Sequence, residues 1–159
     1  RFHLSLSRAT ILFSVLASFY ILGSLLSGKL VNKFGRKPLT IVGYLFLGLL
    51  IILFTNIPRL WASVIIALFC LIFVGIGDSA SNSLTLEQIP RFRGTMMSTY
   101  SAATSLGAVL GAGIGGMILL WSNYQILGIV FGGLGVASAA NYYLFAMDPT
   151  RPDDIAAKH

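Results

Sequence analysis

The sequence has few charged residues and a single cysteine. Only 10% of its 159 residues are charged, against about 25% in an average soluble domain, while 56% are hydrophobic. A soluble fold of this length needs more polar surface to cover its core, so this composition excludes one. Cys70 cannot form a disulfide within the chain, and its place in an apolar run suits a small buried hydrophobe. The composition is that of an integral membrane protein.

The sequence also lacks the residue groupings that catalysis requires. His3 and His159 have no metal or acid partner at a useful spacing, and no Ser-His-Asp set, paired intramembrane carboxylates or phosphate-binding loop occurs. We therefore predict no enzyme activity, no metal and no cofactor. The net charge of +6 does not indicate nucleic acid as a partner, because the cations lie at the ends of apolar segments.

Five apolar stretches are each long enough to cross about 30 Å of hydrocarbon. They show no period-two alternation, and lipid requires every backbone group to be bonded within its own segment, so helices are favoured over a barrel. We predict an all-α integral membrane protein whose surroundings are the lipid bilayer. The transmembrane domain spans 1–147, with helices at about 8–30, 39–55, 60–86, 94–120 and 124–146, and a short tail follows at 148–159.

The positive charges predict the orientation of the chain. Eight of the eleven Lys and Arg residues lie in the connection before residue 39, in the connection near residue 91 and in the tail. Cytoplasmic segments carry such an excess, so we expect these three segments, and hence the C-terminus, in the cytoplasm, with the chain in the plasma membrane. Tyr142 and Tyr143 are then expected near the inner interface.

Three segments resemble signatures of the major facilitator superfamily, in the family's order. The segment 28–37 resembles the loop signature G-x-L-A-D-R-x-G-R-R/K, and 87–95 looks like the acid–proline–arginine signature two helices later. The segment 107–116 resembles the glycine pattern of the following helix. The residues concerned are Gly28, Asn32, Lys33, Gly35, Arg36 and Lys37 in the first segment, Glu87 and Arg93 in the second, and Gly107, Gly111, Gly115 and Gly116 in the third.

The resemblance implies five helices of a six-helix half-bundle, with one helix missing at the front. Asn32 stands where the first-half signature prefers Asp, and Ala112 where the antiporter pattern has Pro, so the second half is favoured. The chain begins at Arg1 and not at methionine, which fits a fragment whose partner is a complementary N-terminal half.

The family also implies a function. It predicts secondary active transport of a small solute by alternating access, without ATP hydrolysis. Proton-coupled efflux is the first expectation, because many bacterial relatives of this pattern look like drug or metabolite exporters. The alternative is a non-transporting membrane module that acts as an assembly or regulatory partner.

Asp78 is the only acid well inside a predicted span. An intramembrane carboxylate is costly unless it is hydrated or paired, and is a functional candidate by default. Asn82 follows one helical turn later, and Ser101 and Ser105 add hydroxyls on the next helix. We expect these four residues to line a central cavity. Asp78 either couples transport to protons or contacts substrate, or it lines a wet cavity without titrating.

The first segment has two interpretations. Its four cations fix the loop in the cytoplasm by themselves. Alternatively, Arg36 and Arg93 approach Glu87 and form a latch at the inner end of the helices, because a guanidinium suits a carboxylate.

The small residues of the helix at 94–120 predict close helix packing. Three of its signature glycines, Gly107, Gly111 and Gly115, lie on one side of the helix, which allows a second backbone to approach, either as static packing or as an interface that slides during transport. The Gly128–Gly132 pair is a weaker instance, to which we assign no function. The almost wholly apolar helices at 39–55 and 124–146 are expected to face lipid.

Overall fold

The computed structural model describes residues 6–88 and 90–146, which form five long helices and one turn of 3-10 helix. No strand occurs in these described ranges, and each long helix is apolar enough to cross a membrane. The prediction of an all-α membrane protein is confirmed. The bounds are Leu6–Phe34 (α1), Arg36–Asn56 (α2), Leu60–Gln88 (α3), Pro90–Phe92 (η1), Arg93–Trp121 (α4) and Tyr124–Phe145 (α5).

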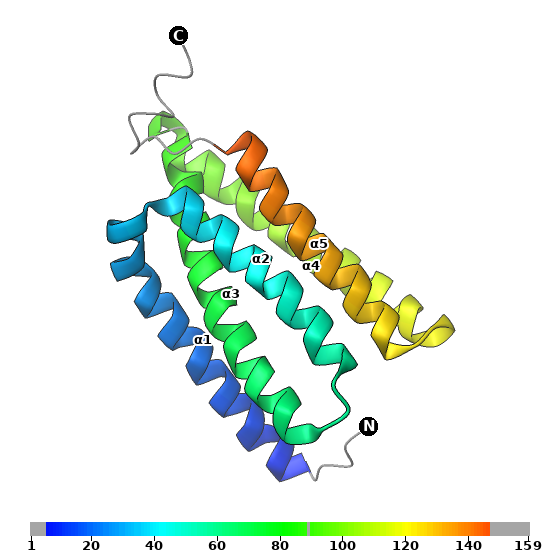
Figure 1. Ribbon diagram of the computed structural model, residues 1–159. Helices are drawn as coiled ribbons and strands as arrows, with labels where there is room; N and C mark the ends of the chain where they lie inside the picture. Colours follow the sequence, from blue (N-terminus) through cyan, green and yellow to red (C-terminus); the bar gives the residue numbers. More distant parts are fainter. Residues whose placement is uncertain (1–5, 89, 147–159) are drawn as a thin grey trace.

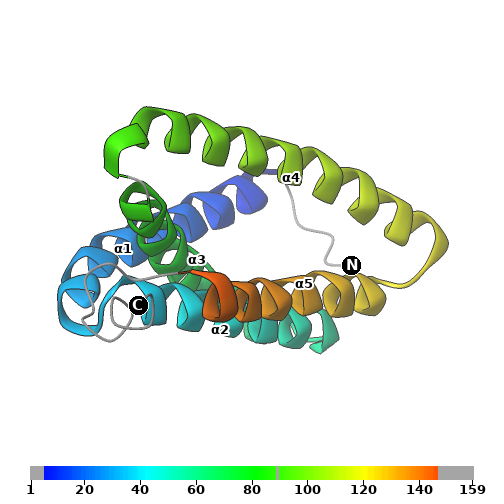
Figure 2. The same ribbon diagram turned by 90° about the horizontal axis from the view of Figure 1, so that it is seen from above.

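Helices α3 and α2 lie in the middle of the bundle, between α1 on one side and α5 on the other (Figure 1). Helices α1 and α2 each pack along α3, and α5 packs along α2. The buried apolar residues Leu39, Ile76 and Ala80 lie where α2 meets α3, and side chains of α1 pack against them. Helix α4 is different: it makes few contacts with the other helices, it stands apart from α1 and α2 in Figure 2, and none of its residues is buried.

Glycine allows the tightest helix crossings. Where α1 crosses α3, a Cβ on Gly23 or Gly75 would collide with the backbone of the opposite helix. Where α5 crosses α2, a Cβ on Gly132 would lie 2.6 Å from the carbonyl oxygen of Gly48. The hydrophobic effect does not favour helix association within lipid, so van der Waals contact between closely packed helices stabilises the bundle. Helices α2 and α5 therefore pack against each other as well as presenting apolar side chains outward.

The connection between α1 and α2 is shorter than the sequence predicted. We expected a break between residues 30 and 39, but α1 continues to Phe34 and α2 begins at Arg36. The only residue between them is Gly35, whose φ of 86° is open to glycine but not to other residues. Lys33 lies in the last turn of α1, where its positive charge interacts favourably with the negative end of the helix dipole. Pro38 lies in the first turn of α2, where it removes no helical hydrogen bond.

Candidate functional site

Asp78 lies on α3, about 25 Å along the helix from Trp61 at a rise of roughly 1.5 Å per residue. Two tyrosines from other helices hold its carboxylate. The Tyr44 hydroxyl on α2 donates a hydrogen bond to Asp78 Oδ1 at 3.2 Å, and the Tyr20 hydroxyl on α1 donates a second. A carboxylate has about four acceptor positions, so two neutral donors leave acceptor capacity on this half-buried group.

A second polar link joins α5 to the same place. The hydroxyls of Tyr142 on α5 and Ser81 on α3 lie 2.7 Å apart, and Ser81 is fully buried. The rings of Tyr142 and Tyr44 stack, with centroids 5.6 Å apart and planes 15° from parallel. The hydroxyl of Tyr142 is directed toward α3, and its expected place near the inner interface stays a prediction. Asp78 is thus connected, through Tyr20, Tyr44 and Tyr142, to three other helices.

The sequence interpretation singled out none of the three tyrosines Tyr20, Tyr44 and Tyr142 as functional. One signal was available: Tyr44 interrupts an otherwise apolar span, and a phenol at that depth needs a polar partner within the protein.

The other predicted cavity residues are only partly gathered. Asn82 is half-buried on α3, one turn from Asp78. Ser101 and Ser105 are exposed on α4, and within the described residues neither makes a side-chain hydrogen bond with α3. The groups that the structure places on Asp78 are therefore tyrosine hydroxyls, and the cavity roles of Asn82, Ser101 and Ser105 stay predictions. In the ranges that the structure describes, no three His, Cys, Asp or Glu side chains gather to hold a metal ion.

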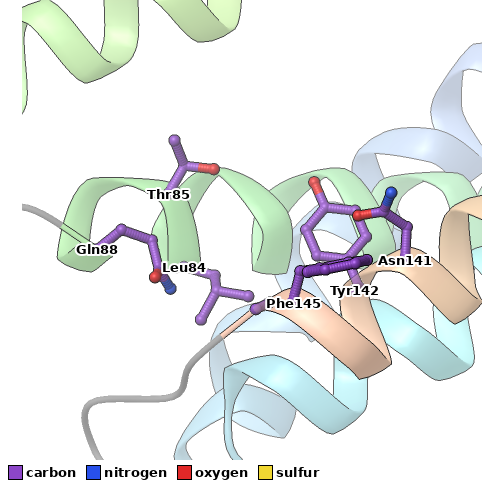
Figure 3. A pocket seen from close by; sticks show the side chains of 7 residues that line it. Leu84, Thr85, Gln88, Asn141, Tyr142 and Phe145 are labelled. Atoms are coloured by element: carbon purple, nitrogen blue, oxygen red, sulfur yellow. The ribbon is translucent and has the colours of Figure 1, made fainter.

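A cavity of about 310 Å³ adjoins the polar cluster, between the ends of α3 and α5 (Figure 3). Its size is in the range of small-ligand sites. Figure 3 shows Leu84 and Gln88 directed from α3 toward α5. The Tyr142 ring contributes to both the cavity and the cluster. The lining residues are uncharged: Leu84, Thr85, Gln88, Asn141, Tyr142, Phe145 and Ala146.

An ion pair joins α2 to the end of α3. Arg36 Nη1 contacts Glu87 Oε2, and both side chains are about a quarter exposed. Because α2 begins at Arg36 and α3 ends one residue after Glu87, the pair ties two helix ends on one side of the bundle. Arg93 is exposed at the start of α4 and makes no ion pair with another described residue. The structure thus brings two of the three predicted latch residues together.

Most of the remaining signature residues are exposed on the surface of the bundle. A Cβ on Gly28 would meet nothing within 4 Å, and Asn32 and Lys33 are exposed, with Lys33 Nζ lying 5.3 Å from the centroid of the Phe34 ring. Lys37 is partly buried in the first turn of α2. These residues remain candidates for contact with cytoplasmic solvent and lipid headgroups.

The glycines of α4 bring no second helix backbone close among the described residues. A Cβ on Gly107 or Gly116 would meet nothing within 4 Å, while Gly111 and Gly115 face only side chains of α5, chiefly the Phe131 ring. The weaker glycine pair of α5 is the one that packs, against Thr55, Ile52 and the backbone of α2. The predicted packing of a second helix backbone against the α4 glycines therefore stays a prediction, and it would involve a helix other than the five described.

Comparison with known proteins agrees with the three motifs. The chain is similar to the inner membrane transport protein YnfM of Escherichia coli (strain K12), with 26% identity over 144 residues. That match covers 89% of this chain and 34% of the relative, so the chain spans about a third of that protein's length. No solved structure gives a significant match. The family model of the Major Facilitator Superfamily matches residues 1–159, and the chain belongs to this superfamily.

Proposed function

We propose that the chain is part of a secondary active transporter that moves a small solute across the plasma membrane by alternating access. The observation that carries this proposal is the polar cluster around Asp78. It lies deep in a span and takes hydroxyl donors from α1 and α2. Apolar side chains at this depth would cost less free energy than a carboxylate with its donors. Family membership and the similarity to a transport protein support the same function. Binding sites of such folds lie near the midplane of the bilayer.

Proton coupling is the mechanism that this cluster supports best. The Asp78 carboxylate has neutral donors, and within the described residues no Lys or Arg contacts it. Such a group can take up and release a proton as its access to water changes, whereas a carboxylate fixed by a cation stays ionised. We further propose export as the direction, and the second half of a twelve-helix transporter as the place of this chain, with a complementary N-terminal half as its partner.

The Arg36–Glu87 pair supports a role at the inner end of the helices. A single partly exposed pair contributes at most about 1 kcal/mol, so it biases a conformational equilibrium without locking it. We expect it to favour one of the two access states, with the C-terminus in the cytoplasm. Glu87→Gln should change the distribution between inward-open and outward-open states, as measured by the accessibility of engineered cysteines. A wild-type distribution would overturn the latch.

Reconstituted vesicles test transport and coupling together. The chain, expressed with whatever sequence its gene places before and after it, is reconstituted with the dye pyranine inside the vesicles. Sugars, amino acids, carboxylates and organic cations are then added one class at a time under an imposed pH gradient. Transport of one class with a matching change in lumenal pH is expected, and Asp78→Asn should abolish the pH change. Solute movement that leaves lumenal pH unchanged would overturn proton coupling, and no movement of any class would overturn transport.

A further inference from the structure

Four helices each direct one group toward the same region of the bundle. Three of these groups are tyrosines and the fourth is a carboxylate. The contacts are the two hydroxyl donors on Asp78 and the stacked pair of Tyr44 and Tyr142. The groups are Tyr20 from α1, Tyr44 from α2, Asp78 from α3 and Tyr142 from α5.

In the part of the chain that the structure describes, no cation faces the carboxylate of this cluster. Asp78 supplies that carboxylate, and its hydrogen-bond donors are neutral phenols. Within the described residues, the Lys and Arg side chains lie near helix ends, and the ion pair there belongs to Glu87. Removing a carboxylate from water without a counter-charge is costly. A bound cation would offset that cost, whereas an anion would add a second negative charge to the same region.

The tyrosines decide which kind of cation fits. Aromatic rings attract cations through the negative charge of their faces, and the effect grows when the cation is desolvated. Tyr20 and Tyr44 donate their protons to Asp78, so their hydroxyl oxygens retain lone pairs that can accept from an ammonium group. A hard metal ion needs about six oxygen ligands, and the cluster holds only one carboxylate. The combination therefore suits a larger, weakly hydrated organic cation.

We infer that the substrate of this chain is an organic cation, an ammonium or quaternary onium compound, held by the Asp78 carboxylate and the surrounding tyrosine rings. The inference rests on the proposed transport function and specifies its substrate class. The cavity beside Tyr142 lies next to this cluster, and its uncharged lining would admit such a cation without trapping it at the entrance.

Two ions of the same shape and opposite charge test the inference. Tetraphenylphosphonium and tetraphenylborate are titrated against the purified protein by equilibrium dialysis in detergent. We expect saturable binding of the phosphonium cation, at least tenfold tighter than any binding of the borate anion. Asp78→Asn should lower the affinity for the cation at least tenfold while leaving that for the anion unchanged or higher. Equal affinities for the two ions, or a variant that binds the cation as tightly as the wild type, would overturn the inference.

A second pair of variants covers the case in which Asp78→Asn does not fold. Tyr44→Phe keeps the ring and removes the hydroxyl, while Tyr44→Leu removes both. The leucine variant should lose several-fold more cation affinity than the phenylalanine variant, because the ring face is the contact. Equal losses would show that the rings do not bind the cation. Binding is measured without transport, so charge-selective binding with no vesicle transport would overturn only the proposed function, and transport of a neutral solute without such binding would overturn only this inference.

Discussion

Replacing Gly132 by alanine tests the close approach of α5 to α2. The new Cβ would lie 2.6 Å from the carbonyl oxygen of Gly48, a backbone atom that cannot rotate away. Overpacking of this kind costs about 1–3 kcal/mol. Alanine in a helix interior offsets about 0.4–1 kcal/mol by restricting the unfolded chain. We therefore expect the variant to unfold more easily than the wild type, with a net loss of about 0.5–2 kcal/mol.

The neighbouring Gly133 provides the matched control. It lies on the same helix, and a Cβ there would meet nothing within 4 Å. Both variants gain the same effect on the unfolded chain, so their difference measures the collision alone, at about 1–3 kcal/mol. For a chain of this size each kcal/mol shifts Tm by roughly 2–4 °C. The assay is thermal unfolding by circular dichroism at a fixed detergent concentration, and equal Tm values for Gly132→Ala and Gly133→Ala would refute the packing argument.

Three further predictions concern the helix connection, the buried hydroxyls and the single cysteine. Gly35→Ala should destabilise the protein by at least about 1 kcal/mol, because φ of 86° with ψ of 165° is essentially restricted to glycine. The control Gly28→Ala should not lower Tm, and equal Tm values for the two variants would contradict this prediction. Ser81→Ala and Tyr142→Phe should each lower the free energy of unfolding by about 1–3 kcal/mol, because each leaves the partner hydroxyl unsatisfied. The double variant should therefore lose less stability than the sum of the single variants. Additive losses would show that the two hydroxyls do not form a hydrogen bond. Cys70, half-buried within α3, should react in intact membranes with a permeant maleimide but not with a charged one; fast labelling by the charged reagent would argue against the span.

Sequence length and hydropathy were sufficient to predict the helices, because a membrane span must be a long, apolar, internally bonded segment. The helix ends were harder. The stretch from Val31 to Phe34 looked like loop because of its cations, yet one glycine completes the reversal and the cations lie on helical turns. Helix packing was the least predictable part. The glycines of α4 and α5 share the same local spacing, and only the positions of neighbouring helices decide that Gly132 is buried and Gly116 is open.

The candidate site was predictable where a residue is unusual by itself. Asp78 stands out in sequence because a carboxylate in a span is costly wherever it points. Arg36 and Glu87 were paired in advance because both lie at helix ends on the same predicted side, and the structure places them in contact. Tyrosine carries a weaker signal than a carboxylate, because it is also enriched at membrane interfaces, and only the depth of Tyr44 in an apolar span distinguishes it. The convergence of Tyr20 and Tyr44 on Asp78 depends on how three consecutive helices pack and rotate against one another.

The place of α3 between α1 and α2 has a consequence for how the chain assembles during synthesis. Among the five helices, α1 and α2 are synthesised before α3 but make few contacts with each other, so we expect no stable hairpin until α3 has been inserted. The α2–α3 pair can then form from adjacent segments, and α1 docks onto it. Helix α5 must reach back past α4 to α2, a long-range contact that forms late. When synthesis stalls before residue 60, α1 and α2 should therefore remain apart from each other in the bilayer, accessible to partners that the finished bundle excludes.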